Sequence, residues 1–344
     1  MDPDAERPLR ILSLDGGGIR GLSSLLILKH LMKRINKENP PRPCEYFDLI
    51  GGTSTGGLIA IMLGRLQMDV DECIVKYQKI SAATFQAKRS PADVLGRGKD
   101  LWKGKGRYKG DRLVEEFKQA ALEFEDNEDA TLFSNDAKFV CTFQADNNTA
   151  VHLRSYEVGD SYELLPTSRC TIWEAARATS AAATYFDPMP IGSHHYVDGA
   201  TGLNNPVEVA LEEARSIWSD ALIRLESIIS IGTGLKNPQA FGDDMIGILK
   251  TLKVISTDTE KTHQRFLRSL GDLGINGRYF RYNIDKGLED VSLDDHGKIG
   301  TIEAATQAYL GLLEVQSSIE SLASLLPPNG GKFNFILKYT TSTD

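Results

Sequence analysis

The first 70 residues contain the same arrangement twice: a short apolar segment, a glycine-rich turn and a helix with an apolar face. In the first unit, residues 10–14 lead into Asp15-Gly16-Gly17-Gly18, and apolar residues then recur at helical spacing over 22–35. In the second unit, residues 46–50 lead into the turn at 51–57, and an apolar helix follows as far as Leu66. Successive strand–turn–helix units predict an α/β fold in which a parallel sheet carries helices on its faces.

The rest of the sequence continues to alternate between strands and helices. We expect strands at 138–144, 151–156, 195–197 and 227–231, and helices at 71–87, 111–125, 171–183, 206–218, 243–270 and 301–325. A chain of 344 residues is within reach of one large α/β domain, and it shows no internal repeat and no linker-like segment. We therefore expect a single domain over 1–344, with a core at about 9–310 and a C-terminal helix and tail at 311–344.

Net charge and cysteine spacing argue against several classes of protein. The net charge of -8 argues against nucleic acid as a partner, because proteins that bind it usually carry a basic excess. The four cysteines include no Cys-x-x-Cys pair, which argues against a structural zinc site or a disulfide framework. Residues 1–10 lack the apolar core of a signal peptide, and the longest apolar runs are too short to cross a bilayer. We expect a cytoplasmic protein.

The first glycine turn fits two different functions. Gly16-x-Gly18-x-x-Gly21 after a strand matches the dinucleotide-binding fingerprint, which would indicate a nucleotide-dependent oxidoreductase. That function also requires an acidic residue at the end of a second strand about 20 residues further on, and residues 36–40 are a polar helix end and turn. Alternatively, the amides of this turn can stabilise the oxyanion formed when an ester carbonyl is attacked, with Arg20 adding a positive charge.

The second glycine turn favours acyl-transfer chemistry. Gly52-Thr53-Ser54-Thr55-Gly56 is a Gly-x-Ser-x-Gly motif between a buried strand and a helix, the setting of a nucleophile elbow. Small residues are required because the serine lies on a strained turn that lifts its hydroxyl above the sheet. The helix that follows directs its N-terminal amides and the positive end of its dipole at the site. An acyl hydrolase explains both turns, whereas nucleotide binding explains only the first.

The general base has two kinds of candidate. A Ser-His-Asp triad would need a histidine late in the chain, but His263 lies in a charged helical stretch and His296 in a polar turn. A base or metal role stays open for His194 and His195. Asp198 is the better candidate, because it ends a short strand and two small residues after it would let the carboxylate approach a serine hydroxyl. In a water-poor pocket, that hydrogen bond can activate the serine.

Three segments together resemble the patatin-like phospholipase family. They are, in chain order, Asp15-Gly16-Gly17-Gly18-Ile19-Arg20-Gly21, Gly52-Thr53-Ser54-Thr55-Gly56 and Asp198-Gly199-Ala200. Residues 173–186 and Gly232-Thr233-Gly234 are similar to two further features of the family, although Ala183 stands where the family commonly has a proline. The resemblance covers about residues 9–235, extends more faintly to about 310, and is closest to the intracellular, fungal-type branch.

The resemblance implies a three-layer α/β/α sandwich with a mainly parallel central sheet, and a Ser-Asp dyad without a histidine. Ser54 would be the nucleophile and Asp198 the base, and the reaction would hydrolyse fatty-acyl esters of glycerophospholipids or related lipids through an acyl-enzyme. No metal or other cofactor is implied, and the acidic residues at 69–72 and 294–295 lack the spacing of a calcium loop. The oxyanion region would be Gly16, Gly17, Gly18 and Arg20, and the elbow Gly52, Thr53, Thr55 and Gly56.

Two further expectations concern partners. The alternative to an enzyme is a catalytically silent or regulated interaction domain of a larger, defence-like receptor, against which the intact Ser54 and Asp198 argue. Residues 97–110 contain six basic residues and one acid, together with Trp102, whose indole suits the headgroup region of a bilayer. A peripheral membrane contact through this segment is one interpretation. The other is a solvated loop that pairs with the acidic run at 123–129.

Overall fold

Strand β1 (Leu9–Leu14) lies at the centre of the fold, and every one of its residues is buried. Leu9 and Ile11 pack into a hydrophobic core on one face of the sheet, and Leu12 and Leu14 into a core on the other. Burial on both faces explains why the strand is mostly apolar, as is typical of central parallel strands. The structure, a computed structural model, describes residues 7–84, 108, 110–134, 138–145, 147–157, 170–182, 185–235 and 259–326.

In the part of the chain that the structure describes, eight strands form one mixed sheet. They are β1 and, in chain order, β2 (Leu49–Thr53), β3 (Lys138–Gln144), β4 (Thr149–Arg154), β5 (Met189–Ile191), β6 (His194–Asp198), β7 (Leu225–Ile231) and β8 (Tyr279–Tyr282). Their pairing order is β5-β6-β3-β2-β1-β7-β8, with β4 also paired to β3. The pairs among β3, β2, β1, β7 and β8 are parallel, and those that involve β4, β5 or β6 are antiparallel. The expectation of a mainly parallel central sheet is therefore confirmed.

Strand β3 brings two distant strand ends together. β4 pairs along one edge of β3, from Phe139 to Gln144. A strand has only two edges, so β2 and β6 share the other one: β2 pairs as far as Cys141, and β6 pairs from Thr142 onward. Because β2 runs parallel to β3 and β6 antiparallel to it, the two strands meet end to end. Their last residues, Thr53 and Asp198, lie opposite consecutive residues of β3.

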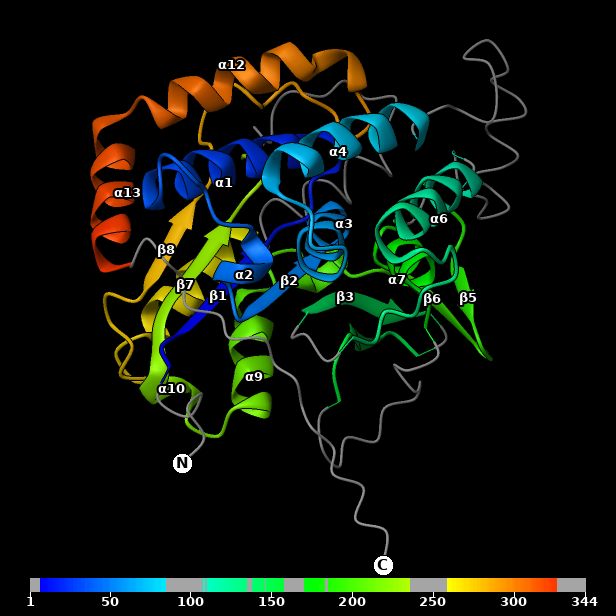
Figure 1. Ribbon diagram of the computed structural model, residues 1–344, viewed down its shortest axis with the longest axis horizontal. Coiled ribbons are helices and arrows are strands. Elements are labelled where there is room, and N and C mark those ends of the chain that lie inside the picture. Colours follow the sequence, from blue (N-terminus) through cyan, green and yellow to red (C-terminus); the bar gives the residue numbers. More distant parts are fainter. Residues whose placement is uncertain are drawn as a thin grey trace, which may run out of the picture.

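Helices cover both faces of the sheet, which gives the expected three-layer sandwich (Figure 1). One layer contains α1 (Gly21–Ile35), α4 (Val70–Thr84), α12 (Ile299–Leu310) and α13 (Leu313–Leu325). The other contains α9 (Val207–Ile217), α10 (Ala221–Arg224) and a helix at 259–269. The shorter or more peripheral helical elements are η1 (Gly18–Arg20), α2 (Pro43–Tyr46), α3 (Thr55–Ala60), η2 (Ile61–Arg65), α6 (Asp111–Glu125), α7 (Ile172–Thr179), α8 (Ala200–Leu203) and η5 (His296–Lys298).

Several predicted elements differ from the observed ones. The helix predicted at 301–325 is two helices, because α12 ends at Leu310 and the backbone of Leu312 is extended before α13 begins at Leu313. The helix predicted at 71–87 is described as far as Thr84, and of the one predicted at 243–270 only 259–269 is described as helix. β5 and β8 were not predicted, because each is very short and neither shows a clear alternation.

The C-terminal part of the described chain belongs to the core. Val315, Ile319 and Leu322 of α13 are buried in the same cluster as α1, so this segment is part of a helical layer. All four cysteines are buried as free thiols. Within the ranges that the structure describes, no helix is long and apolar enough to span a membrane.

Candidate active site

The two glycine turns lie side by side at the carboxyl ends of β1 and β2, the edge at which open α/β sheets bind ligands. The close approach of backbone at this edge leaves no room for side chains. A Cβ added at Gly56 would lie 2.2 Å from the Leu14 carbonyl oxygen, and one added at Gly52 would lie 2.2 Å from the Gly56 carbonyl oxygen. Both glycines of the Gly-x-Ser-x-Gly motif are therefore required by packing.

Ser54 has the strained backbone of a nucleophile elbow. Its φ of 55° and ψ of -127° lie outside the regions that non-glycine residues commonly adopt. The Ser54 N–H donates to Thr179 Oγ1 at 3.0 Å, and the Thr179 hydroxyl donates to the Cys141 carbonyl at 2.8 Å. α7 and β3 thus hold the turn in this conformation. α3 begins directly after Ser54, so the unpaired amides of its first turn lie beside the serine.

The first glycine turn offers one amide without a hydrogen-bond partner. Gly18 has a φ of 57°, lines the same pocket as Ser54, and has no acceptor for its N–H among the described residues. It is therefore the amide that can donate to an oxyanion without breaking an existing bond. The neighbouring amides are occupied, by the Asn204 carbonyl for Gly16 (3.1 Å), the Thr55 hydroxyl for Gly17 (3.0 Å) and the Leu293 carbonyl for Ile19 (2.8 Å).

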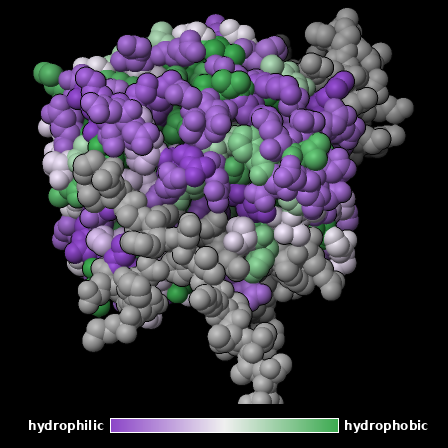
Figure 2. All heavy atoms as spheres, viewed as in Figure 1, coloured by the Kyte–Doolittle hydropathy of each residue, from purple (hydrophilic) through white to green (hydrophobic). Residues whose placement is uncertain are grey.

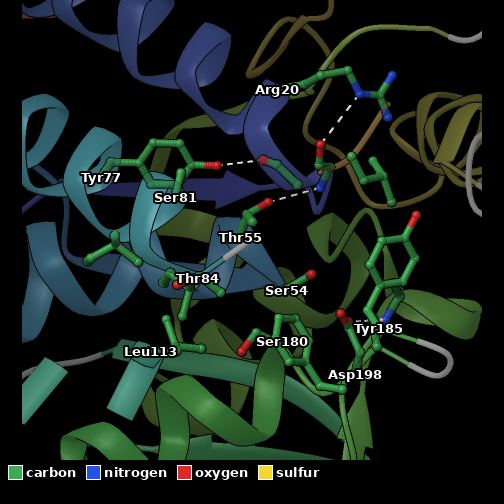
Figure 3. A pocket seen from close by; sticks show the side chains of 18 of the residues that line it. Arg20, Ser54, Thr55, Tyr77, Ser81, Thr84, Leu113, Ser180, Tyr185 and Asp198 are labelled. Atoms are coloured by element: carbon green, nitrogen blue, oxygen red, sulfur yellow. Dashed lines mark hydrogen bonds between the residues drawn. The ribbon is translucent and has the colours of Figure 1, made fainter. Parts of the chain in front are cut away.

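Arg20 supports this turn from behind. It is buried and lines the pocket (Figure 3). Its Nε donates to the Gly17 carbonyl at 3.4 Å and its Nη1 to the Gly234 carbonyl at 3.3 Å. Burial lowers the pKa of Arg20 to about 10, so the guanidinium is still a cation at neutral pH. Arg20 thus combines the positive charge predicted for this position with a structural contact to the turn.

Asp198 ends β6 at the point where β6 meets β2, which brings its carboxylate to Ser54. Figure 3 shows the Ser54 hydroxyl and the Asp198 carboxylate in one cavity. Burial of Asp198 raises the pKa of its carboxyl group to about 7, although hydrogen bonds from the Ser54 hydroxyl and the Ala200 N–H act to lower it. The Ala200 bond is 2.8 Å long. The site therefore brings together a half-buried hydroxyl on a strained turn and a carboxylate with the pKa of a base suited to neutral pH.

The pocket around this pair has a volume of about 750 Å³, including its open mouth. Its walls come from α3, α4, α6 and the segments near 185 and 293, and they are largely apolar. Tyr77 lies in this wall, and its hydroxyl donates to the Gly18 carbonyl at 2.5 Å. The apolar residues that line the pocket include Leu58, Ile80, Leu113, Tyr185, Phe186 and Leu293.

Several of these contributions are not predicted by the sequence. The helical spacing over α4 indicates that Tyr77 is buried, but not that it contacts the first glycine turn. Thr55 is predicted only as part of the elbow, whereas its hydroxyl also accepts the Gly17 N–H and links the two turns. No signal in the sequence indicates Leu293, which reaches the turn from a part of the chain more than 200 residues away.

The histidines that are alternative candidates for the base do not line the pocket that contains Ser54 and Asp198. No histidine within the described ranges lines the pocket. His194 Nδ1 lies 2.8 Å from Gln144 Nε2, and His263 Nδ1 lies 2.9 Å from the Tyr279 hydroxyl. His195 and His296 are exposed. The described part of the chain also contains no cluster of three or more His, Cys, Asp or Glu side chains that could hold a metal ion.

Two features singled out from the sequence lie outside the described residues. Of the basic segment 97–110, the structure describes only Tyr108 and Gly110. The predicted membrane contact through this segment therefore stays a prediction. Ala183, which departs from the family pattern, also lies outside the described part.

The chain is similar in sequence to a known protein family and to proteins named phospholipases. The family model for patatin-like phospholipases matches residues 12–211. Calcium-independent phospholipase A2-gamma of Rattus norvegicus is 31% identical over 320 residues, which cover 90% of this chain and 39% of that protein. Phospholipase A I of Arabidopsis thaliana is 29% identical over 276 residues, 66% of this chain and 21% of that protein. VipD from Legionella pneumophila, a solved structure, is 12% identical, with a TM-score of 0.37, over 88% of this chain and 67% of VipD. The chain thus spans less than two fifths of the length of these two curated relatives.

Proposed function

Since this chain belongs to the patatin-like phospholipase family, we propose that it hydrolyses acyl esters of glycerophospholipids or related lipids through a dyad of Ser54 and Asp198. One observation carries the proposal. The strained serine, a carboxylate whose pKa is about 7 and the unpaired amide of Gly18 all face one largely apolar pocket. These are the nucleophile, the base and the oxyanion donor that ester hydrolysis requires.

In the first half of the reaction, the Ser54 oxygen attacks the ester carbonyl carbon and its proton passes to the Asp198 carboxylate. The Gly18 N–H donates to the oxyanion, assisted by the first amides of α3 and the charge of Arg20. The carbon–oxygen bond to the leaving alcohol then breaks, and Asp198 returns the proton to that alcohol. The acyl group remains on Ser54.

In the second half, water attacks the acyl-enzyme while Asp198 accepts its proton. The fatty acid leaves, and Ser54 regains its hydrogen. An aspartate in water is too weak a base for this work, since its ordinary pKa is 3.8. Burial beside Ser54 raises the pKa of Asp198 to about 7. A general base is most efficient when its pKa lies near the pH of the reaction, so this value suits a reaction at neutral pH.

The pocket supports a lipid as the substrate. Leu58, Ile80 and Leu113 form an apolar wall beside Ser54 that suits a fatty-acyl chain. Each methylene buried there contributes about 0.8 kcal/mol to binding. Curated relatives are named phospholipases, in agreement with this class of substrate. The head group and the acyl position that is cleaved are to be read from the products formed on mixed phospholipid vesicles.

The test uses Ser54→Ala and Asp198→Asn, assayed on a soluble chromogenic ester and on phospholipid vesicles. Each change should lower turnover at least about 1000-fold, and the double variant should lose no more than the single ones, because the two residues act as a unit. A fluorophosphonate probe should label the wild-type protein and not Ser54→Ala. Wild-type protein that neither reacts with the probe nor hydrolyses lipid would support the alternative, a catalytically silent interaction domain.

A matched control is available on the surface. Ser216 lies on α9 and donates its hydroxyl to the Glu212 carbonyl at 2.9 Å, away from the pocket. Ser216→Ala should keep full labelling and full turnover. An Asp198→Asn variant that retains more than about a tenth of wild-type turnover would refute the histidine-free dyad.

Contact with a membrane and a cytoplasmic location are further parts of the proposal. On the face shown in Figure 2, the described residues are mostly hydrophilic, and hydrophobic ones occur among them in small groups. We propose the basic segment 97–110 as a docking element. Lys103→Glu, Lys105→Glu and Lys109→Glu together should lower activity on anionic vesicles and leave soluble-ester turnover unchanged. Equal effects on both substrates would exclude this role. Assignment to the fungal-type branch is likewise a prediction.

A further inference from the structure

Arg281 of β8 forms a buried ion pair with Asp15, the residue from which the first glycine turn starts. Its Nη1 donates to Asp15 Oδ1 at 2.9 Å and its Nη2 to Asp15 Oδ2 at 2.6 Å. The side chains of Arg281 and Asp15 are 7% and 1% exposed. β8 is not adjacent to β1, so the guanidinium reaches across β7, where Nη1 also donates to Ser230 Oγ at 2.8 Å.

Other residues near the end of β8 support the same region. Asn283 accepts the Gly234 N–H at 2.8 Å and donates to Glu260 at 3.0 Å. In the turn that follows β7, the Thr233 hydroxyl donates to the Gly16 carbonyl at 2.9 Å. The first glycine turn is therefore held from behind by the end of β7, and the end of β7 is held by β8. Of these residues of β8 and the segment after it, Arg281 is the one that contacts Asp15, from which the first glycine turn starts.

Stability alone does not account for a buried pair of this kind. Replacing a buried ion pair by well-packed apolar residues is often neutral or stabilising, because two charges must be removed from water. The Nε of Arg281 adds a further cost, since this buried N–H has no hydrogen-bond partner among the residues that the structure describes. What the pair does provide is geometry: the fork of two parallel N–H···O bonds fixes both the position and the orientation of the Asp15 carboxylate.

The charge on Asp15 depends on this contact. Burial raises the pKa of Asp15 to about 6, with Arg281 acting to lower it, so the carboxylate is largely ionised at neutral pH. Without the guanidinium, only the raising influences of burial and Glu260 would remain. The carboxyl group would then become neutral or draw in water. Either change alters the residue that precedes Gly16.

We propose that Arg281 is a positioning residue for ester hydrolysis: by fixing Asp15 it fixes the Gly16–Gly18 turn, so that the Gly18 N–H is correctly placed for the oxyanion. The inference rests on the proposed function. It also assigns a role to a residue outside the segment 12–211 that matches the family. Arg281 does not line the pocket, so it acts on the reaction through Asp15.

The test compares Arg281→Gln with Arg154→Gln. Arg154 makes the same kind of contact, a buried two-bond pair with Glu213, but it lies outside the pocket. Turnover and KM are measured on a soluble ester, fluorophosphonate labelling is timed, and all rates are normalised to folded protein by circular dichroism. Arg281→Gln should lower kcat and the labelling rate about 10- to 100-fold, with KM within about twofold of wild type, because small displacements of catalytic groups cost this much. Arg154→Gln should lose stability and keep kcat within about twofold.

Two further variants keep the test valid if Arg281→Gln folds poorly. Arg281→Lys retains the charge and loses the fork, so its kcat should lie between those of wild type and Arg281→Gln. The double variant Asp15→Asn, Arg281→Gln leaves no buried charge unpaired, and its kcat should remain low. A normal kcat per folded molecule in these variants, with labelling at Ser54 intact, would overturn the positioning role alone. Wild-type protein that is not labelled at Ser54 would overturn the proposed function, and this inference with it.

Discussion

Asp198 and Glu213 are buried to nearly the same extent, 5% and 3% exposed, and yet they titrate in opposite directions. Burial acts to raise the pKa of both. For Glu213, hydrogen bonds and charge from Arg154 and His152 outweigh burial and lower the pKa to about 2. For Asp198, the contacts among the described residues that act to lower the pKa are the Ser54 hydroxyl and the Ala200 N–H, and the pKa is about 7.

The difference shows that buried carboxylates in one fold can have opposite pKa shifts, depending on the groups around them. Glu213 connects α9 to β4, because Arg154 donates two hydrogen bonds to it, at 2.5 and 2.7 Å, and Tyr156 donates a third at 2.5 Å. Asp198 has no cation among the causes of its shift. A paired charge makes a carboxylate part of the scaffold, whereas an unpaired one remains ready to accept a proton.

The largest effect is expected from breaking the Glu213 network. Arg154→Gln leaves a buried carboxylate without its counter-charge and should lower the free energy of unfolding by about 3–5 kcal/mol. Urea denaturation at pH 7 measures this loss. The double variant Arg154→Met, Glu213→Leu should recover most of it, because no charge then remains buried. A loss below about 1 kcal/mol in Arg154→Gln would show that the network is not a structural element.

Replacing Asp198 should raise the free energy of unfolding, the opposite of the effect expected for Arg154. Its pKa is raised in the folded protein, so the stability associated with its proton is present below pH 3.8 and is lost as the pH rises through about 7. Asp198→Asn should therefore raise the free energy of unfolding at pH 8 by on the order of 2–4 kcal/mol, and the gain should vanish near pH 4. Urea titrations at both pH values give the comparison. An Asp198→Asn variant that is inactive but no more stable than wild type at pH 8 would contradict the conclusion that burial of the ionised carboxylate destabilises the fold.

A third expectation concerns the rate of reaction. If Asp198 must be ionised to accept the Ser54 proton, kcat/KM on a soluble ester should fall about tenfold for each pH unit below about 7. His194→Ala should show the same profile, because His194 contacts Gln144 and not the pocket. If kcat/KM instead begins to fall only near pH 4, the pKa of Asp198 is not raised above that of an aspartate in water.

The smallest effect should follow metal removal. The mechanism that we propose for Ser54 and Asp198 uses no metal ion, so EDTA or EGTA should change soluble-ester hydrolysis by less than about twofold. Calcium dependence that is seen only on vesicles would point to the membrane contact. A large calcium requirement on a soluble ester would show that a metal ion takes part in the reaction. Asp198 could then no longer be contrasted with Glu213 as a carboxylate that acts without a cation.

The local parts of this site could be predicted from the sequence. The strand–turn–helix order places both glycine turns at one edge of a sheet, and the motif spacing identifies Ser54 before any coordinates are known. The three-layer fold follows from the same alternation, together with the resemblance to a known family. These features depend on residues that are close together in the chain.

The remaining parts depend on long-range pairing and could not be predicted. Nothing in residues 194–198 indicates that β6 shares an edge of β3 with β2, which is what brings Asp198 to Ser54. The pKa of Asp198 depends on burial by segments from the whole chain. The choice of Gly18 as the free amide depends on which carbonyls and hydroxyls happen to meet Gly16 and Gly17 in three dimensions.

The pair of Asp15 and Arg281 also has a consequence in time. The two residues are 266 positions apart, so on a ribosome that adds 5–20 residues per second Arg281 follows Asp15 by about 13–53 s. Ser54 and Asp198 are both synthesised before Arg281 is. Under the proposed mechanism, the nascent chain therefore acquires its nucleophile and base before the residue that we propose positions the oxyanion turn, and ester hydrolysis would begin only after the last strand of the described sheet is made.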